Sequence, residues 1–179
     1  MKKEILFFFT LIILINYGCD KASPVPDEIT NQVDTQSISN TNLSGNSLGQ
    51  VDPTDWVFDA KWMATETALL LTPTAAQLAN TADTATVIPY LAIPNPLVSQ
   101  FKWGFKTTKP AFLQIVITDN LLNVKWRQTL TTQVGANFVD VPMPETEYLT
   151  NRNYRLYYAF YCAAKGLYYK GHGDVAVRR

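Results

Sequence analysis

The 179-residue chain is poor in cysteine, histidine and net charge. It has two cysteines and one histidine, and its 15 basic residues balance 15 acidic ones. Two cysteines are too few for a disulfide scaffold or a cysteine-rich zinc site, and one histidine is too few for a histidine triad. Without an excess of Lys and Arg, the chain lacks the charge with which proteins bind phosphate backbones. We therefore expect no metal, no cofactor and no nucleic-acid partner.

Sequence motifs of common enzyme classes are also missing. The chain contains no G-x-x-x-x-G-K-[ST] loop, no G-x-G-x-x-G fingerprint and no H-E-x-x-H motif. Its one histidine, His172, stands between Gly171 and Gly173, which predicts a bulge or kink in an edge strand. The acidic residues of the second half fall in or beside predicted turns, so they nominate no carboxylate pair for glycoside hydrolysis. The sequence predicts no catalytic residue and a protein that is not an enzyme.

The N-terminal apolar run is too short to cross a bilayer. It extends from Ile5 to Ile15, about 11 residues, whereas a membrane helix needs roughly 20. The run follows a start with two lysines, which is typical of a signal peptide. Gly18-Cys19 then closes a segment that resembles the lipobox of bacterial lipoproteins. The resemblance implies a signal peptide over residues 1–18, a diacylglyceryl group on Cys19 and a protein anchored in the bacterial cell envelope, at the outer membrane. An ordinary secretory signal followed by an incidental cysteine is the alternative.

Two segments without regular periodicity follow the cysteine. Residues 19–52 are rich in Ser, Thr, Asn, Gln and Gly and contain no aromatic side chain, a composition that predicts a disordered tether. Residues 53–85 read as irregular chain with a short helix, because Thr74 and Gln77 have the spacing of a capping box. Acidic residues predominate in this half and basic residues in the other. The N-terminal segment is thus expected either to lie along the rest of the chain by charge attraction or to be solvated independently.

From residue 86 onward, short β-rich runs alternate with turn residues. Seven or eight strands are expected, at about residues 86–93, 100–106, 111–118, 124–130, 137–141, 154–162 and 167–170 with a continuation at 174–177. The spacing predicts an all-β fold, a small antiparallel β-sandwich over residues 86–179. Gly166 is expected to supply the left-handed residue of the last hairpin.

Alternation along two of these strands assigns side chains to faces. Leu113, Ile115 and Ile117 share one face of their strand. Tyr154, Leu156, Tyr158, Phe160 and Cys162 share one face of theirs, so Cys162 is expected to be a small buried hydrophobe. The segment Leu149 to Tyr157 resembles the one that enters the penultimate strand of immunoglobulin-like and fibronectin type III sandwiches. That resemblance implies a tyrosine corner, in which the hydroxyl of Tyr154 binds upstream backbone.

The excess of aromatic residues, 12% of the chain, is the one feature that points to binding. If the second face of the same strand is exposed, an amphipathic interaction patch forms from Arg155, Tyr157, Tyr161, Tyr168 and Lys170. The alternative is that these tyrosines fill a half-buried sheet. The expected function is a membrane-anchored, non-catalytic binding or structural module with an envelope protein or glycan as partner.

Two further functions remain open at this point. One is a carbohydrate-binding accessory lipoprotein, which requires at least two exposed aromatic rings in one plane with polar neighbours. The other follows from a second resemblance. Pro94-Asn95-Pro96 opening a terminal β-domain that closes near Arg179 is similar to the sorting domains of type IX secretion cargo, and this implies a sorting or adhesion module.

Overall fold

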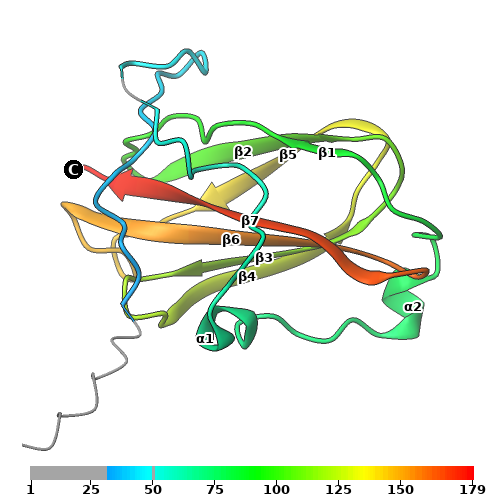
Figure 1. The fold of residues 1–179 in the computed structure, drawn as a ribbon. Coiled ribbons are helices and arrows are strands. Elements are labelled where there is room, and N and C mark those ends of the chain that lie inside the picture. The colour runs from blue at the N-terminus through cyan, green and yellow to red at the C-terminus, as the bar shows by residue number, and fades with distance from the viewer. Residues whose placement is uncertain (1–31, 50) are drawn as a thin grey trace, which may run out of the picture. The chain divides into compact units, whose positions relative to one another are not determined.

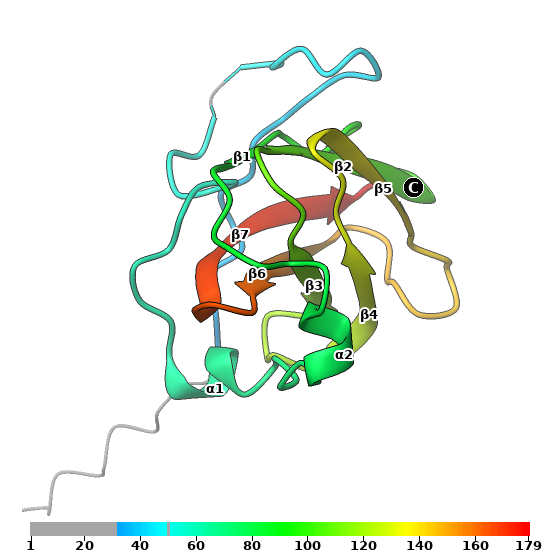
Figure 2. The same cartoon turned by 90° about the vertical axis from the view of Figure 1, so that its right-hand side faces the viewer.

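The computed structural model describes residues 32–49 and 51–179, which form two antiparallel sheets packed face to face (Figure 1). The three-stranded sheet has the order β1-β2-β5 and consists of β1 (Val87–Pro89), β2 (Gln100–Thr107) and β5 (Gly135–Pro142). The four-stranded sheet has the order β4-β3-β6-β7 and consists of β4 (Val124–Thr131), β3 (Phe112–Thr118), β6 (Arg152–Cys162) and β7 (Gly166–Val177). Figure 2, which looks nearly along the strands, shows the two layers. The expected small all-β sandwich is confirmed.

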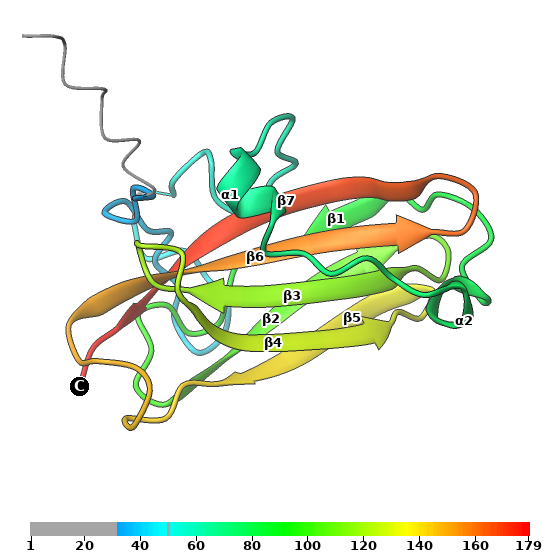
Figure 3. The same cartoon turned by 90° about the horizontal axis from the view of Figure 1, so that it is seen from below.

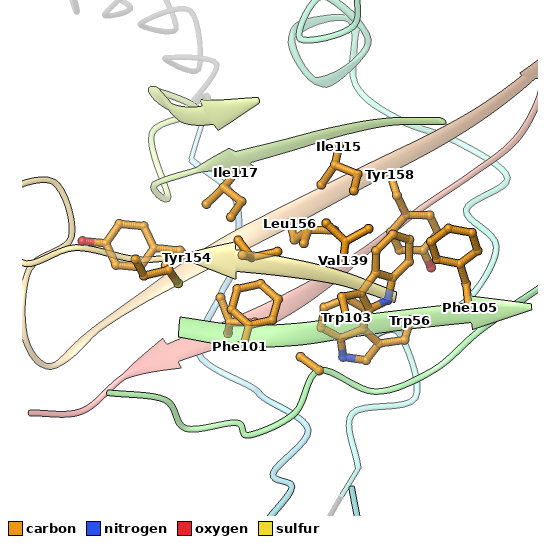
Figure 4. Packing of buried hydrophobic residues seen from close by; sticks show 14 of the residues in the cluster. Trp56, Phe101, Trp103, Phe105, Ile115, Ile117, Val139, Tyr154, Leu156 and Tyr158 are labelled. Atoms are coloured by element: carbon orange, nitrogen blue, oxygen red, sulfur yellow. The ribbon is translucent and has the colours of Figure 1, made fainter. Parts of the chain in front are cut away.

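The core lies between the sheets and is largely aromatic (Figure 4). The ring of Trp103 on β2 stacks on that of Tyr158 on β6, with 4.8 Å between centroids. Phe105 meets Phe160 edge to face at 5.2 Å. All four side chains are buried, and full burial of each such side chain contributes about 1.5–3 kcal/mol. The face assignment made for β6 is therefore confirmed.

In the four-stranded sheet β4 lies beside β3, and β6 and β7 complete the sheet. The expected tyrosine-corner contact is present, because the backbone N–H of Leu149 donates to the hydroxyl of Tyr154 at 2.7 Å. That bond fixes the chain as it enters β6.

Two details at β1 and β7 differ from the sequence expectation. The first strand is only three residues long, because Pro89, Pro94 and Pro96 lack the N–H that a continuous ladder needs. The bulge expected at His172 lies instead at Tyr168, while His172 pairs regularly with Tyr157. Gly166 has a φ of 71°, as the hairpin required.

The glycines around His172 are explained by a close approach from another segment. A Cβ on Gly173 would lie 2.2 Å from the ring of Trp56, and one on Gly171 would lie 2.1 Å from the carbonyl oxygen of Val57. The N–H of Trp56 donates to the carbonyl of His172 at 2.6 Å, and that of Asp59 donates to Lys170 at 2.9 Å. Residues 56–59 therefore line the free edge of β7, and Trp56 closes the core from that side.

Residues 59–72 then cross the outer face of the four-stranded sheet. We call them the second strap, because an earlier segment, residues 33–41, also covers this face. They contain α1 (Ala64–Thr67), which lies over β6 and β7 in Figure 3. The chain continues into α2 (Ala75–Leu78), whose capping box is present as expected: the N–H of Thr74 donates to the side chain of Gln77 at 2.8 Å. Leu69 packs with Val116 and Tyr157, so this strap buries apolar side chains on a sheet face that points away from the core.

Residues 33–41, called the N-terminal strap, cover the same sheet face nearer the end at which β6 begins (Figure 1). Val33, Ser39 and Thr41 are buried, and the side chain of Asn153 on β6 donates to the carbonyl of Thr35 at 2.5 Å. The tether interpretation of residues 19–52 is therefore wrong for this part. Hydrogen bonds of buried polar side chains hold the segment against the sheet, and such contacts leave no apolar periodicity in the sequence.

Candidate functional site

The interaction patch expected on β6 and β7 is not an exposed surface. Tyr157 is completely buried and Tyr161 nearly so, whereas Tyr168 and Lys170 are half-buried. Arg155 is half-buried as well. The residues do lie on neighbouring strands as predicted, but chain from the first half of the sequence covers them. The alternative, in which tyrosines fill a buried sheet face, is the arrangement found.

The second strap covers Tyr157 through specific contacts. The Tyr157 hydroxyl donates to the carboxylate of Glu66 at 2.8 Å, and the ring of Trp62 meets the Tyr157 ring edge to face at 5.1 Å. The ammonium of Lys170 lies 5.0 Å above the Trp62 ring. Burial, together with the negative charge of Glu66, raises the pKa of Tyr157 well above its usual value. The phenol is therefore a neutral donor that binds the second strap to β6.

His172 lies at the edge of the same cluster. Its Nδ1 lies 2.6 Å from Oδ2 of Asp59, which also accepts a 2.7 Å hydrogen bond from the indole of Trp62. This carboxylate joins the second strap to β7. Cys162 is buried at the end of β6, as expected. Among residues 32–49 and 51–179, no group of three or more His, Cys, Asp or Glu side chains could hold a metal ion.

A buried polar cluster attaches the N-terminal strap to β7. The carboxylate of Asp55 accepts from the N–H and hydroxyl of Ser39 at 3.1 and 3.0 Å and from the N–H of Asp174 at 2.9 Å. Arg155 binds Asp174 through two nitrogens, at 2.8 and 2.7 Å, and also donates to the carbonyl of Asp34. The amide nitrogen of Asn95 donates to the carbonyls of Ser39 and Asp174. Strap, β7 and the Pro94–Pro96 loop are therefore one hydrogen-bonded unit.

Burial changes the acidity of this cluster. Desolvation, and then the charge of Asp174, raise the pKa of Asp55 from 3.8 to about 6, although three hydrogen bonds oppose the shift. Burial also raises the pKa of Asp174, against the opposing effect of the Arg155 guanidinium. These carboxylates are closed in by the strap, which indicates a structural rather than a binding role.

The outer face of the three-stranded sheet is the better candidate for a binding surface. Tyr90, just beyond β1, and Phe138 on β5 extend over Gly104 of β2, with their ring centroids 6.4 Å apart and an angle of 41° between the rings. Phe138 is 56% exposed and Ile88 beside them is 49% exposed. A Cβ at Gly104 would lie 2.7 Å from the Phe138 ring and 2.9 Å from that of Tyr90, so only glycine allows both rings to approach the strand this closely.

Polar groups and two hollows surround this aromatic pair. The ammonium of Lys102 lies 3.5 Å from the carboxylate of Asp140, and both side chains are more than half exposed. They border a hollow of about 390 Å³ that also includes Phe101. A larger hollow of about 600 Å³ is lined by Tyr90, Ile93 and other apolar or small residues, together with Asp52 and Asp55. The face thus combines aromatic rings, donors and acceptors, as ligand sites require.

Sequence reasoning missed Tyr90, Gly104 and Phe138. A signal for Phe138 was present, because it alternates with Val139, which points to the core, and so falls on the solvent side of a half-buried strand. The pairing of Tyr90 with Phe138 depends on the order β1-β2-β5, which the chain order alone does not specify.

Comparisons of the chain with protein families, with curated proteins and with solved structures find no match in any of the three. The lipobox and the acceptor cysteine, Cys19, lie outside the residues that the structure describes. Within residues 32–49 and 51–179, no helix has the length and apolar character needed to cross a membrane.

Proposed function

We propose that this protein is a lipid-anchored, non-catalytic binding module of the bacterial cell envelope. The lipobox-like segment supports the anchor. The observation that supports binding is the asymmetry of the sandwich. Two straps cover the outer face of the four-stranded sheet, while Phe138 is exposed and Tyr90 half-buried on the outer face of the three-stranded one. Exposed aromatic rings with polar neighbours are typical of binding surfaces.

The anchor is tested by comparing the expressed protein with a Cys19→Ala variant. Intact mass and membrane fractionation are measured for both. The wild type is expected to lose residues 1–18, gain a diacylglyceryl group and sediment with membranes, and the variant to do none of these. A soluble, unmodified wild type would contradict the anchor.

A carbohydrate is the ligand that the open face favours. Tyr90 and Phe138 give two adjacent rings. Lys102 lies two residues before Gly104 on β2, and Asp140 lies two residues after Phe138 on β5, so both face outward beside the rings. Sugars offer C–H faces that stack on aromatic rings and hydroxyl groups that bind donors and acceptors. The rings are inclined by 41° and Tyr90 is half-buried, so the pair departs from the two exposed coplanar rings expected for a carbohydrate binder.

Binding of soluble envelope and plant-type polysaccharides tests this assignment. The protein is titrated with each, and intrinsic fluorescence is followed. Phe138→Ala is expected to weaken binding about tenfold, since one stacked ring contributes about 1.4 kcal/mol. Gly104→Ala, which displaces both rings, should weaken binding as much. Val134→Ala, at an exposed site elsewhere, is the control. Equal affinities for the three variants would exclude this face as the site.

The sorting-module alternative gains less support. It placed the domain at residues 94–179, whereas Trp56 and Val87 belong to the core and Asn95 is fully buried beneath the N-terminal strap. The folded unit thus includes chain well before the Pro-Asn-Pro sequence.

A further inference from the structure

The described chain begins at one particular end of the sandwich. The N–H of Val33 donates to the carbonyl of Asn120, in the connection between β3 and β4, at 2.9 Å. β6 begins at this end and β7 finishes here, since Arg152 pairs with Val177. Figures 1 and 3 both show the C-terminus and the first described residues at this end. We call it the Val33 end.

Three loops at the Val33 end each expose one large apolar side chain. Val98 before β2 is 62% exposed, Leu121 between β3 and β4 is 59% exposed, and Leu149 before β6 is 63% exposed. Leu121 and Leu149 line the same hollow of about 300 Å³. At the opposite end, Val134 is 64% exposed in the 132–134 loop, and Leu71, which lines a hollow with Tyr161 and Leu167, is 55% exposed.

Hydrogen bonds hold these loops in place. The guanidinium of Arg179 donates to the carbonyls of Val98, Tyr148 and Met143, and so joins two of the loops. The backbone N–H of Leu149 donates to the hydroxyl of Tyr154. The apolar side chains are thus presented from fixed backbone, which lowers the entropic cost of binding a surface.

Charges at this end suit a lipid headgroup layer. Lys125 is paired with Asp119 at 3.3 Å, and Arg179 with Glu145 at 3.6 Å. Within the described part of the chain, Arg152 and Arg178 are exposed and form no salt bridge. The same is true of Glu147, which lines the hollow with Leu121 and Leu149, so the unpaired charges at this end are two positive and one negative among these three residues. Arginine side chains beside inserted apolar residues can reach lipid phosphates.

The length of chain between the anchor and the sandwich limits which surface can meet the membrane. Twelve residues, 20–31, separate Cys19 from Gln32, and they span at most about 40 Å. β7 has 12 residues, so the sandwich itself is about 40 Å long. The far end could reach the bilayer only with those residues fully stretched. The Val33 end needs no such extension.

From these observations we infer that the Val33 end rests on the lipid bilayer, with Val98, Leu121 and Leu149 inserted at headgroup depth. The inference rests on the proposed anchor at Cys19. It places the strands roughly along the membrane normal, so that the open face of the three-stranded sheet stands clear of the lipid at the side.

Single-cysteine probes on the full-length lipoprotein test the orientation. Leu149→Cys and the matched control Val134→Cys, 63% and 64% exposed at opposite ends, are labelled with an environment-sensitive fluorophore. Cys162 is buried and the unsubstituted chain gives the background. The proteins are reconstituted in vesicles of phosphatidylethanolamine and phosphatidylglycerol with and without a doxyl-labelled lipid. At position 149 we expect blue-shifted emission and quenching at least about threefold greater than at position 134.

A combined Val98→Gln, Leu121→Gln and Leu149→Gln variant gives a second readout. These side chains are exposed, so the fold should be retained, and circular dichroism checks this. The variant should stay anchored, but protease should cleave its Val33-end loops faster than those of the wild type in vesicles. Val134→Gln should leave the cleavage rate unchanged.

The outcomes separate the two proposals. Intact mass reports acylation independently of the probes. If the protein is acylated but the two probes are quenched equally, the orientation is wrong and the anchor stands. A blue shift at position 149 without lipid quenching would mean that protein covers this end, which also overturns the orientation. If no acyl group is found, the anchor fails and the orientation fails with it.

Discussion

The two sheets of this sandwich differ in what lies on their outer faces. On the four-stranded sheet the second strap covers Val116 and Tyr157, and the N-terminal strap covers the start of β6. On the three-stranded sheet Ile88 and Phe138 remain exposed to solvent. In the four-stranded sheet β3 and most of β6 are thus buried on both faces, whereas no residue of the edge strand β4 is fully buried. The three-stranded sheet is buried on one face only.

The composition of the strands reflects this difference in burial between the two sheets. All seven residues of β3 are buried, and its sequence is almost continuously apolar. β5 alternates, with Val139 and Val141 pointing inward and Phe138 outward. A continuous apolar strand indicates cover on both faces even in an antiparallel sheet. The cover must then come from segments that look unstructured in the sequence.

The largest expected effect comes from removing Trp56, which fixes the start of the second strap in the core. Its ring lies 6.0 Å from Trp103 and packs against Gly173. Trp56→Ala should lower the free energy of unfolding by about 3–5 kcal/mol, because it leaves a large cavity. Urea denaturation measures this. Phe58→Ala, a neighbour that is 53% exposed, is the control and should cost far less. Equal losses would mean that Trp56 does not anchor the strap.

The next effect concerns pH and the N-terminal strap. The pKa of Asp55 is raised from 3.8 to about 6 in the folded protein, so folding favours its protonated form. The associated stability is fully present below about pH 4 and is lost as pH rises through about 6, an effect of about 3 kcal/mol. The raised pKa of Asp174 acts in the same direction.

Urea denaturation at intervals from pH 4 to pH 7 measures this loss. Asp55→Asn has no carboxylate at this position, so its stability should change much less over the same range, whatever its absolute value. A wild type whose stability is constant or increases from pH 4 to pH 6.5 would contradict the assignment.

A smaller effect is expected from the hydrogen bond between Tyr157 and Glu66. Tyr157→Phe removes a buried donor and leaves the carboxylate of Glu66 with one partner fewer, which should cost about 1–3 kcal/mol. Amide hydrogen exchange should show a loss of protection mainly in residues 61–72. Tyr90→Phe makes the same change on the open face and should leave both stability and exchange unchanged. A loss of protection spread evenly over the chain would show that the second strap does not open separately from the rest of the fold.

The alternation of β-rich runs predicted much of this fold. The bounds of β2, β3 and β4 agree with expectation to within one residue. Leu113, Ile115 and Ile117 share one face of β3 as expected, and the inward face of β6 is the one assigned from period two. These features depend on local pattern. The hydroxyl of Tyr154 is also where the resemblance to immunoglobulin-like sandwiches placed it.

The straps could not be predicted in this way, because their contacts are long-range and polar. Ser39 binds Asp55, and Asn95 binds Asp174, across 16 and 79 positions of sequence. A segment rich in Ser, Thr and Asn has the same composition whether it is solvated or fully hydrogen-bonded to a sheet. The pairing of Tyr90 with Phe138 was missed for a related reason, since it arises from strand order.

The smallest effect on stability should come from Phe138→Ala. Because this substitution should leave the fold intact, it tests the role of the open face most directly. Its ring is 56% exposed and contacts Tyr90, so Phe138→Ala should change the free energy of unfolding by less than about 0.5 kcal/mol. Tyr161→Ala removes an aromatic residue of the covered sheet and should cost about 3 kcal/mol or more. A large loss for Phe138→Ala in urea denaturation would mean that this ring supports the fold. A negligible loss would show that the fold does not depend on this ring, as its proposed role in binding requires.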